Sequence, residues 1–143
     1  MKKLPKNTAT LQTLQNNMIR VIMGLKKEKH INMSHIRNKF QIMSVNQICI
    51  YHTILEAYNI MRNGASEQIQ MKWTNTRENN YSLRSITRKD LKVPDKPMPK
   101  CLGFSYNGSK LFNLLPKVLR ENQNSHTFKK LTKEWIWKNI PSI

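Results

Sequence analysis

Three residues with metal-binding chemistry follow one another in a segment with helical periodicity. Cys49, His52 and Glu56 stand at positions i, i+3 and i+7, which places them on one side of a helix. Each is a possible zinc ligand, but a structural zinc site needs a fourth, and the sequence contains no Cys-x-x-Cys or His-x-x-x-His pair. We therefore interpret them as a small buried thiol beside an ordinary His/Glu pair, and predict no metal and no cofactor.

Carboxylates, which many catalytic mechanisms need, are few and scattered. The chain of 143 residues contains 8 Asp and Glu, and Asp90 and Asp95 fall in a segment with clustered prolines. Neither a Gly-rich phosphate loop nor a Ser or Cys nucleophile motif is present. A pair of catalytic cations would need carboxylates fixed on rigid elements. The sequence therefore predicts no active site.

Positive charge is the strongest chemical signal in the sequence. Lys and Arg number 25 against 8 acids, giving a formal net charge of +17 and a pI near 10.2. Such a field attracts phosphate backbones or anionic lipid. No apolar run approaches the roughly 18 residues of a membrane span, and no apolar signal segment follows the basic start. We therefore expect nucleic acid rather than a membrane as partner, and the nucleus or cytoplasm rather than secretion.

Residues 8–25 show the spacing of an amphipathic helix. Apolar side chains recur three and four positions apart. The resulting stripe contains Leu11, Leu14, Met18, Val21, Ile22 and Leu25. Ile19 and Met23 lie off this stripe, which indicates contact with a second surface, and Gly24 is the predicted terminator.

Two more helices are predicted in the N-terminal half. Ser34 is a suitable N-cap for a short helix that reaches Phe40. Ser44 and Gln47 have the spacing of a capping box before a longer helix over residues 45–62. Because the apolar arc of this longer helix is wide, we expect it to be the central core helix.

The fold class predicted from these patterns is mainly α, a small helical domain of about four or five helices with a long irregular arm. The N-terminal helical part covers residues 1–64. Residues 65–100 form a basic, Pro-containing arm without a sustained period. The C-terminal helical part, residues 101–143, is expected to pack back on the first. Its first residues, 101–106, are predicted as a short extended segment that turns into the terminal helices at Asn107-Gly108.

The last predicted helix combines an apolar and a basic side. Ser125 is the expected N-cap, and Phe128, Leu131 and Trp135 form a predicted core stripe, with Thr132 and Ile136 at its margin. The other side contains Lys129, Lys130, Lys133 and Trp137. Two interpretations stay open. Ammonium groups and an indole ring suit phosphates and bases, whereas a solvated lysine face with Trp137 folded back is the alternative.

Three segments resemble, in order, parts of the reverse transcriptases of jockey-like non-LTR retrotransposons. "LQNNMIRVIMG" is similar to their L-Q-N-x-x-[LI]-R-x-I-x-G segment, and "IMSVNQI" to their I-L-S-V-x-x-L helix start. "LFNLLPKVLRENQNSHTFKKLTK" resembles their C-terminal L-W-N-x-L-P … S-x-x-F-K-x-x-L-K signature, with Phe112 in place of Trp. The order and rough spacing agree over nearly the whole chain.

This resemblance implies a thumb or post-thumb region of an RNA-directed DNA polymerase. It implies a structural corner and a seated last helix, formed by Leu111, Phe112, Asn113, Leu115 and Pro116, and by Ser125, Phe128, Lys129 and Leu131. Because the family's palm domain and its Tyr-x-Asp-Asp motif are absent, we expect the chain to be inactive alone. Met1 is then expected to begin a gene fragment, and the remainder of the polyprotein is an expected partner.

The expected function is nonspecific binding of template-primer duplex or element RNA. The predicted contact residues are Arg20, Lys26, Lys27, Lys29, Arg84, Arg88, Lys89, Lys129, Lys130, Lys133 and Trp137. They are mainly phosphate ligands, from the end of the first helix, the arm and the last helix. Two alternatives stay open: a free-standing helical protein that binds DNA or RNA, and a non-functional retroelement relic.

Overall fold

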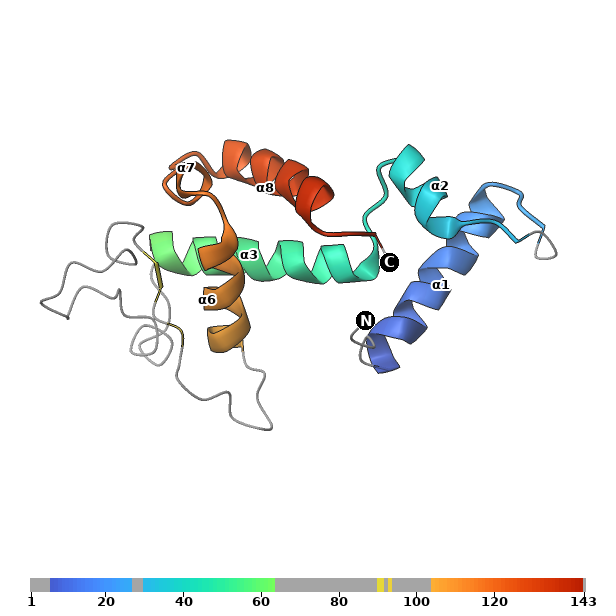
Figure 1. The fold of residues 1–143 in the computed structure, drawn as a ribbon, viewed down its shortest axis with the longest axis horizontal. Coiled ribbons are helices and arrows are strands. Elements are labelled where there is room, and N and C mark those ends of the chain that lie inside the picture. Colours follow the sequence, from blue (N-terminus) through green and yellow to red (C-terminus); the bar gives the residue numbers. More distant parts are fainter. Residues whose placement is uncertain (1–5, 27–29, 64–89, 92, 94–103, 143) are drawn as a thin grey trace, which may run out of the picture. The chain divides into compact units, whose positions relative to one another are not determined.

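The computed structural model describes residues 6–26, 30–63, 90–91, 93 and 104–142. These residues form six α-helices (Figure 1), which are α1 (Lys6–Ile22), α2 (Met33–Lys39), α3 (Val45–Asn63), α6 (Phe104–Leu114), α7 (Lys117–Arg120) and α8 (Ser125–Asn139). The prediction of a mainly α fold is confirmed. The predicted arm lies almost wholly outside the described residues, so its irregularity stays a prediction.

The chain divides into two compact units. Unit 1 contains Met1–Cys49 and Trp135–Ile143, and unit 2 contains Ile50–Glu134. The division therefore falls within α3 and within α8, whereas the sequence pattern suggested divisions near residues 64 and 100. Because unit 1 draws on both ends of the chain, the C-terminal residues are part of the same unit as α1 and α2.

In unit 1, α1 packs through its polar side. Gln15 Nε2 donates to the Met43 carbonyl at 2.8 Å, and the Val45 N–H donates to Gln12 Oε1 at 2.9 Å. Ile19 is the buried apolar residue of this helix. The contact predicted from Ile19, which lies off the apolar stripe, is thus the one that forms. The stripe itself, from Leu11 to Ile22, is more than half exposed.

The end of α1 follows the prediction. Gly24 has φ of +63°, a left-handed conformation that glycine adopts without strain. The N–H groups of Gly24 and Leu25 donate to the carbonyls of Val21 (3.1 Å) and Arg20 (2.9 Å), which satisfies the last turn of the helix. The following described residues lead into α2.

The N-cap of α2 is Asn32 rather than the predicted Ser34. Asn32 Oδ1 accepts from the N–H groups of Ser34 and His35 at 3.0 and 3.3 Å. A capping side chain accepts from the second and third helical N–H groups, and an Asn two positions before Ser34 satisfies this rule equally well. The Ser34 hydroxyl instead accepts from Arg37 Nη2 at 3.1 Å.

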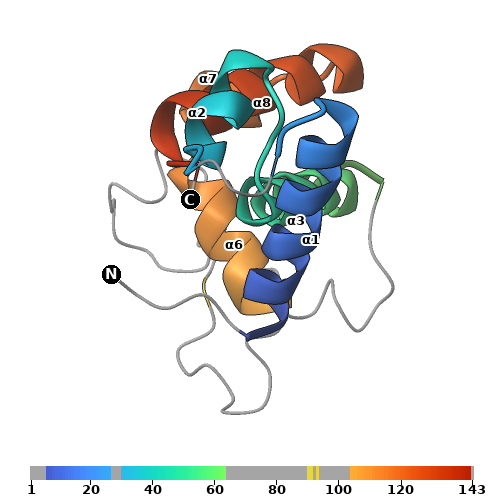
Figure 2. The same cartoon turned by 90° about the vertical axis from the view of Figure 1, so that its right-hand side faces the viewer.

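The capping box at the start of α3 is present as predicted. The Ser44 N–H donates to Gln47 Oε1 at 2.9 Å, and the Gln47 N–H donates to Ser44 Oγ at 3.4 Å. Gln47 also donates through Nε2 to the Ile140 carbonyl at 2.8 Å. One buried amide therefore caps α3 and holds the C-terminal segment of unit 1, which lies beside α2 (Figure 2).

Unit 2 is organised around the part of α3 that follows Ile50. Figure 1 shows α8 alongside α3 and running in the opposite direction, with α6 crossing α3. Ile54 and Ala57 on α3 are fully buried, together with Phe128 on α8. This agrees with the predicted role of the helix as a core element.

The region before α7 differs from the prediction in one respect. The expected turn at Asn107-Gly108 and the extended conformation expected for residues 104–106 are wrong, because α6 begins at Phe104 and continues through Gly108. Residues 101–103 of that predicted segment lie outside the described residues. The side chain of Asn113 on α6 forms a pair of hydrogen bonds with the backbone of Leu91, both at 2.8 Å. Phe112 and Leu115 are buried, so the corner that leads to Pro116, the N-cap of α7, is a packed one.

Candidate nucleic-acid interface

Helix α8 begins with an Asn cap one residue earlier than predicted. Asn124 Oδ1 accepts from the N–H groups of His126 and Thr127 at 2.9 and 3.2 Å, so Ser125 is the first helical residue. This cap fixes the first turn of the helix. The first lysine of the basic side, Lys129, lies one turn after Ser125.

The buried side of α8 is rotated from the predicted one. Phe128, Thr132 and Ile136 have no exposed surface, whereas Leu131 and Trp135 are half-buried. A spacing of four residues advances a helix by about 40° beyond a full turn, so i, i+4, i+8 selects a different face from i, i+3, i+7. The predicted margin is therefore the core, and Thr132 Oγ1 is buried there without a hydrogen bond to any residue that the structure describes.

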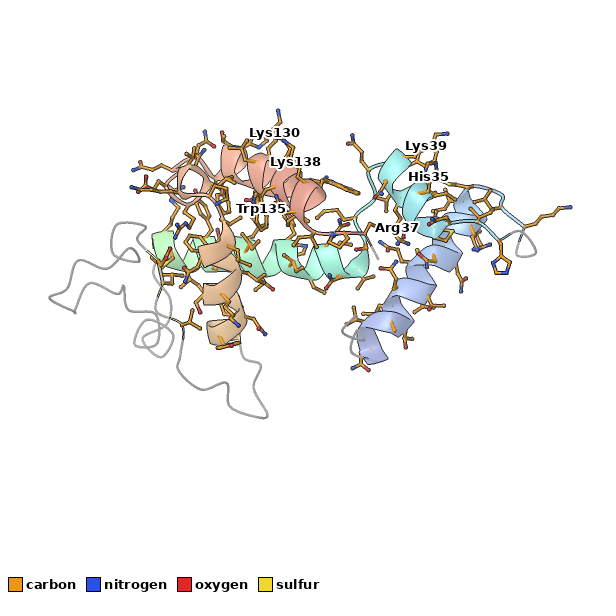
Figure 3. All side chains as sticks on the ribbon, viewed as in Figure 1. His35, Arg37, Lys39, Lys130, Trp135 and Lys138 are labelled. Carbon is orange, nitrogen blue, oxygen red and sulfur yellow. The ribbon has the colours of Figure 1, made fainter. Side chains whose placement is uncertain are left out.

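Three exposed lysines of α8 lie in unit 2. They are Lys129, Lys130 and Lys133. In the part of the chain that the structure describes, none of them has an ion-pair partner. Figure 3 shows Lys130 on the side of α8 that faces away from α3. Their ammonium groups are available to an external anion, and exposed Glu134 borders them on the same helix.

An aromatic stack holds the first turn of α8 against α3. Tyr58 on α3 and Phe128 on α8 have ring centroids 3.8 Å apart and planes 9° from parallel. The Tyr58 hydroxyl donates to the Asn122 carbonyl at 2.9 Å and accepts from Arg62 Nη1 at 2.8 Å. Arg62 also donates to the Gln123 carbonyl. The segment before α8 is thus tied to α3 at several points, which holds Lys129 and Lys130 on a fixed backbone.

Trp137 lies one turn beyond Lys133 on the same helix, in unit 1. Its side chain is half-buried rather than fully exposed. Part of the indole remains accessible for stacking. This placement lies between the two interpretations that the sequence left open, because the ring packs partly against the protein and is partly available.

Unit 1 is the more strongly basic of the two units. By sequence it contains ten Lys and Arg against one acid, Glu28, and its described residues include no carboxylate side chain. Lys26 is exposed, and Arg20 is half-buried with Nη1 enclosed and without a hydrogen bond in the described structure. Cations of this unit therefore have little local negative charge to neutralise them.

Two exposed lysines of unit 1 were not among the predicted contacts. Lys39 on α2 and Lys138 at the end of α8 are both exposed (Figure 3). The exposure of Lys39 could have been predicted from its position in the helix. It lies four residues after exposed His35, on the outer side of α2, whereas Arg37 points inward.

Arg37 is a structural cation rather than a phosphate ligand. It is almost fully buried, and its guanidinium donates to Asn16 Oδ1 (2.5 Å), Ser34 Oγ (3.1 Å) and Ser142 Oγ (3.1 Å). Burial lowers the pKa of Arg37 from its ordinary value. It joins α1, α2 and the C-terminal segment, a role that the sequence pattern did not indicate.

Several predicted contact residues lie outside the described residues. These are Lys27, Lys29, Arg84, Arg88 and Lys89. Asp90, one of the few described residues of the predicted arm, accepts from Arg120 Nη1 at 2.6 Å in a largely buried ion pair. Its carboxylate therefore serves as the partner of a structural arginine.

The three residues with metal-binding chemistry are exposed along α3. Cys49, His52 and Glu56 lie at the surface, so the expected burial of the Cys49 thiol is wrong. The rings of Tyr51 and His52 form a T-shaped contact with centroids 5.5 Å apart. Within the described residues, His, Cys, Asp and Glu do not gather in any group of three or more that would hold a metal ion.

None of the helices described here has the length and apolar character needed to cross a membrane. Comparison with protein-family models, with curated proteins and with solved structures finds no match to this chain.

Proposed function

We propose that the chain binds nucleic acid without base specificity, through phosphate contacts from lysines and arginines of both units. The observation that supports this most directly is the state of Lys129, Lys130 and Lys133. They are exposed on a helix that is fixed by the Tyr58–Phe128 stack, and they have no ion-pair partner among the described residues. A fixed row of unneutralised cations binds a phosphate backbone by releasing its counterions.

The side-chain types favour phosphate contact over base reading. Lys and Arg both contact guanine in the major groove and Asn and Gln contact adenine, but the planar fork of Arg fixes a bidentate geometry that a lysine ammonium does not. The exposed side of α8 offers lysines, which interact with phosphates as point charges. The described chain also gives three of its arginines internal partners, namely Arg37 within unit 1, Arg62 with Tyr58, and Arg120 with Asp90. Binding is therefore expected to differ little between sequences.

We propose further that this binding serves a retrotransposon reverse transcriptase, as its non-catalytic C-terminal part. The support is the resemblance of three ordered segments, two of which coincide with packed parts of the fold: the Ser44 capping box and the corner of Phe112 and Leu115. The remainder of such a polyprotein would carry the polymerase site. An in-frame palm domain with Tyr-x-Asp-Asp upstream of Met1 in the genomic DNA would support this assignment, and intergenic sequence there would contradict it.

Binding is tested by the salt dependence of affinity for an RNA/DNA hybrid. The logarithm of the association constant is expected to fall linearly with the logarithm of salt concentration, by about 0.9 for each phosphate contact on B-form DNA and comparably on a hybrid. Affinity that does not change with salt, or no binding at low salt, would contradict the proposal. Hybrids of unrelated sequence should bind with similar affinity, and a preference of several kcal/mol for one site would indicate a groove reader instead.

The role of α8 is tested by a charge-matched pair of variants. Lys130→Gln/Lys133→Gln removes two unpaired cations, and the slope is expected to fall by about 2 if each contacts one phosphate. The control, Lys110→Gln/Lys117→Gln, removes the same charge from lysines that already contact Tyr106 and Glu121. Its slope should change less. Equal slopes for the two variants would leave net charge as the explanation and remove α8 from the interface.

A further inference from the structure

Helix α1 presents an apolar side to solvent. Five large side chains on it are between 53% and 80% exposed, namely Leu11, Leu14, Met18, Val21 and Ile22. Several of them, with Asn17, line a shallow depression of about 340 Å³ on the helix surface. Contiguous exposed apolar surface of this extent marks an interaction site on a protein.

The orientation of α1 is fixed by its opposite side. Gln12 and Gln15 are bonded to the backbone of Val45 and Met43, and Asn16 accepts from buried Arg37. Ile19 is buried on that same side. Rotating the helix to hide the apolar stripe would break these hydrogen bonds and expose Ile19. The apolar side must therefore face away from the rest of unit 1 while this unit keeps its structure.

The spacing along this side is that of a coiled-coil seam. Leu11, Leu14, Met18 and Val21 are separated by three, four and three residues, which corresponds to alternating a and d positions of a heptad. Two helices pack along such a seam by inserting each of these side chains between four side chains of the partner helix. The occupant that fits the stripe is consequently another amphipathic helix.

The charge around the seam identifies which helix fits. No charged residue occurs between Lys6 and Arg20 in a chain whose net charge is +17. The positions that flank the seam are Thr10, Gln15, Asn17 and Ile22. A site for an acidic helix or an anionic membrane would be expected to have basic flanks. Two copies of this chain, in contrast, can meet only where their lysines do not face each other.

We propose that two copies of the chain associate through α1, with Leu11, Leu14, Met18 and Val21 of each helix at the contact. Burying this side on both copies removes on the order of 1,000 Å² from water, about the lower limit for a specific interface. Each copy carries a formal net charge of +17, so the two copies repel each other across the contact. Salt screens this repulsion, so the dimer should strengthen as salt rises.

This sign of the salt effect is opposite to that of nucleic-acid binding, so the two proposals fail or succeed separately. The test is sedimentation velocity of the full chain without nucleic acid, from about 1 to 100 µM, at about 0.05 and 0.5 M salt. We expect a monomer–dimer equilibrium whose dissociation constant falls about 10-fold or more between the two salt concentrations. A monomer throughout this range at high salt would overturn the proposal.

A charge-neutral variant assigns the contact to α1. Met18→Gln/Val21→Gln keeps the net charge and uses a good helix former. Since each dimer of this variant loses four apolar side chains at the contact, two from each copy, the dissociation constant of the variant should rise about 100-fold or more. The matched control is Leu114→Gln/Val118→Gln, which changes two exposed apolar residues of unit 2 and should leave association unchanged. Circular dichroism should show the same helix content for all forms.

Two other results would assign the stripe to a different partner. If the Gln variant associates as the parent does, the dimer forms elsewhere and the proposal is wrong. If the chain stays monomeric but binds vesicles of anionic phospholipid, and the Gln variant does not, the stripe contacts a membrane surface and the proposal is equally overturned.

Discussion

Tyr58 offers the sharpest test of how α8 is held, because one oxygen atom can be removed while the ring stays. The hydroxyl donates to the Asn122 carbonyl at 2.9 Å and accepts from Arg62 at 2.8 Å, and the residue is only 3% exposed. Tyr58→Phe leaves the Asn122 carbonyl without this donor, whereas exposed Arg62 can bond to water. We expect the free energy of unfolding to fall by about 1 to 2 kcal/mol.

Phe128 probes the ring contact itself. Phe128→Ala removes a fully buried side chain, so unfolding should become easier by about 3 to 5 kcal/mol. The rings lie at 3.8 Å and 9°, close to a face-to-face arrangement, which is electrostatically the less favoured one. In a double-mutant cycle between Tyr58→Leu and Phe128→Leu we therefore expect a coupling near the lower end for aromatic pairs, about 0.5 kcal/mol.

Urea denaturation, followed by circular dichroism and by Trp fluorescence, measures these free energies. The matched control is Tyr51→Phe on the same helix. The described residues give the Tyr51 hydroxyl no hydrogen bond, so the change should stay within about 0.5 kcal/mol. If Tyr58→Phe and Tyr51→Phe are equally stable, the Tyr58 hydroxyl does not hold the segment before α8, and the reasoning about its position is refuted.

Three further measurements test separate features. Gly24→Ala places a side chain at φ of +63°, so thermal unfolding should show a loss of about 1 kcal/mol, and an unchanged midpoint would contradict the left-handed end of α1. Asp90→Asn leaves Arg120 without its buried ion-pair partner and should destabilise by about 3 kcal/mol, more than Glu121→Gln at the exposed Lys117 pair. Burial raises the pKa of the Tyr51 hydroxyl above its ordinary value of 10.0. The stability that the neutral Tyr51 side chain contributes is therefore complete below about pH 10 and is lost as the pH rises through the folded-state pKa. The free energy of unfolding of Tyr51→Phe should consequently decline less in alkali than that of the parent protein.

Local signals were sufficient where one short motif determines the structure. The Ser44–Gln47 box and the left-handed Gly24 are formed by residues within one turn of each other, and both are present. The caps at Asn32 and Asn124 were assigned to nearby serines, because Asn and Ser are equally good caps and adjacent candidates compete.

Periodicity located the helices but did not identify their buried sides. The apolar stripe of α1 has the stronger pattern, yet the helix is anchored by Gln12 and Gln15, whose partners are backbone groups that no sequence pattern reveals. On α8 the inward side includes Thr132, a polar residue that pattern analysis assigns to a margin. Of the candidate lysines, Lys129, Lys130 and Lys133 were correctly placed on a helix, whereas their partner nucleic acid stays a prediction.

The hydrogen bonds that complete unit 1 have a consequence for synthesis. Gln47 and Ile140 are 93 residues apart, and Arg37 and Ser142 are 105 residues apart. At about 5 to 20 residues per second, a ribosome needs roughly 5 to 20 s to deliver those partners after the first helices have emerged. During that interval the guanidinium of Arg37 lacks the Ser142 hydroxyl, and the amide of Gln47 lacks its carbonyl. Helices α1 and α2 are therefore expected to reach their final packing only after translation has passed Ser142, as a late step with high contact order.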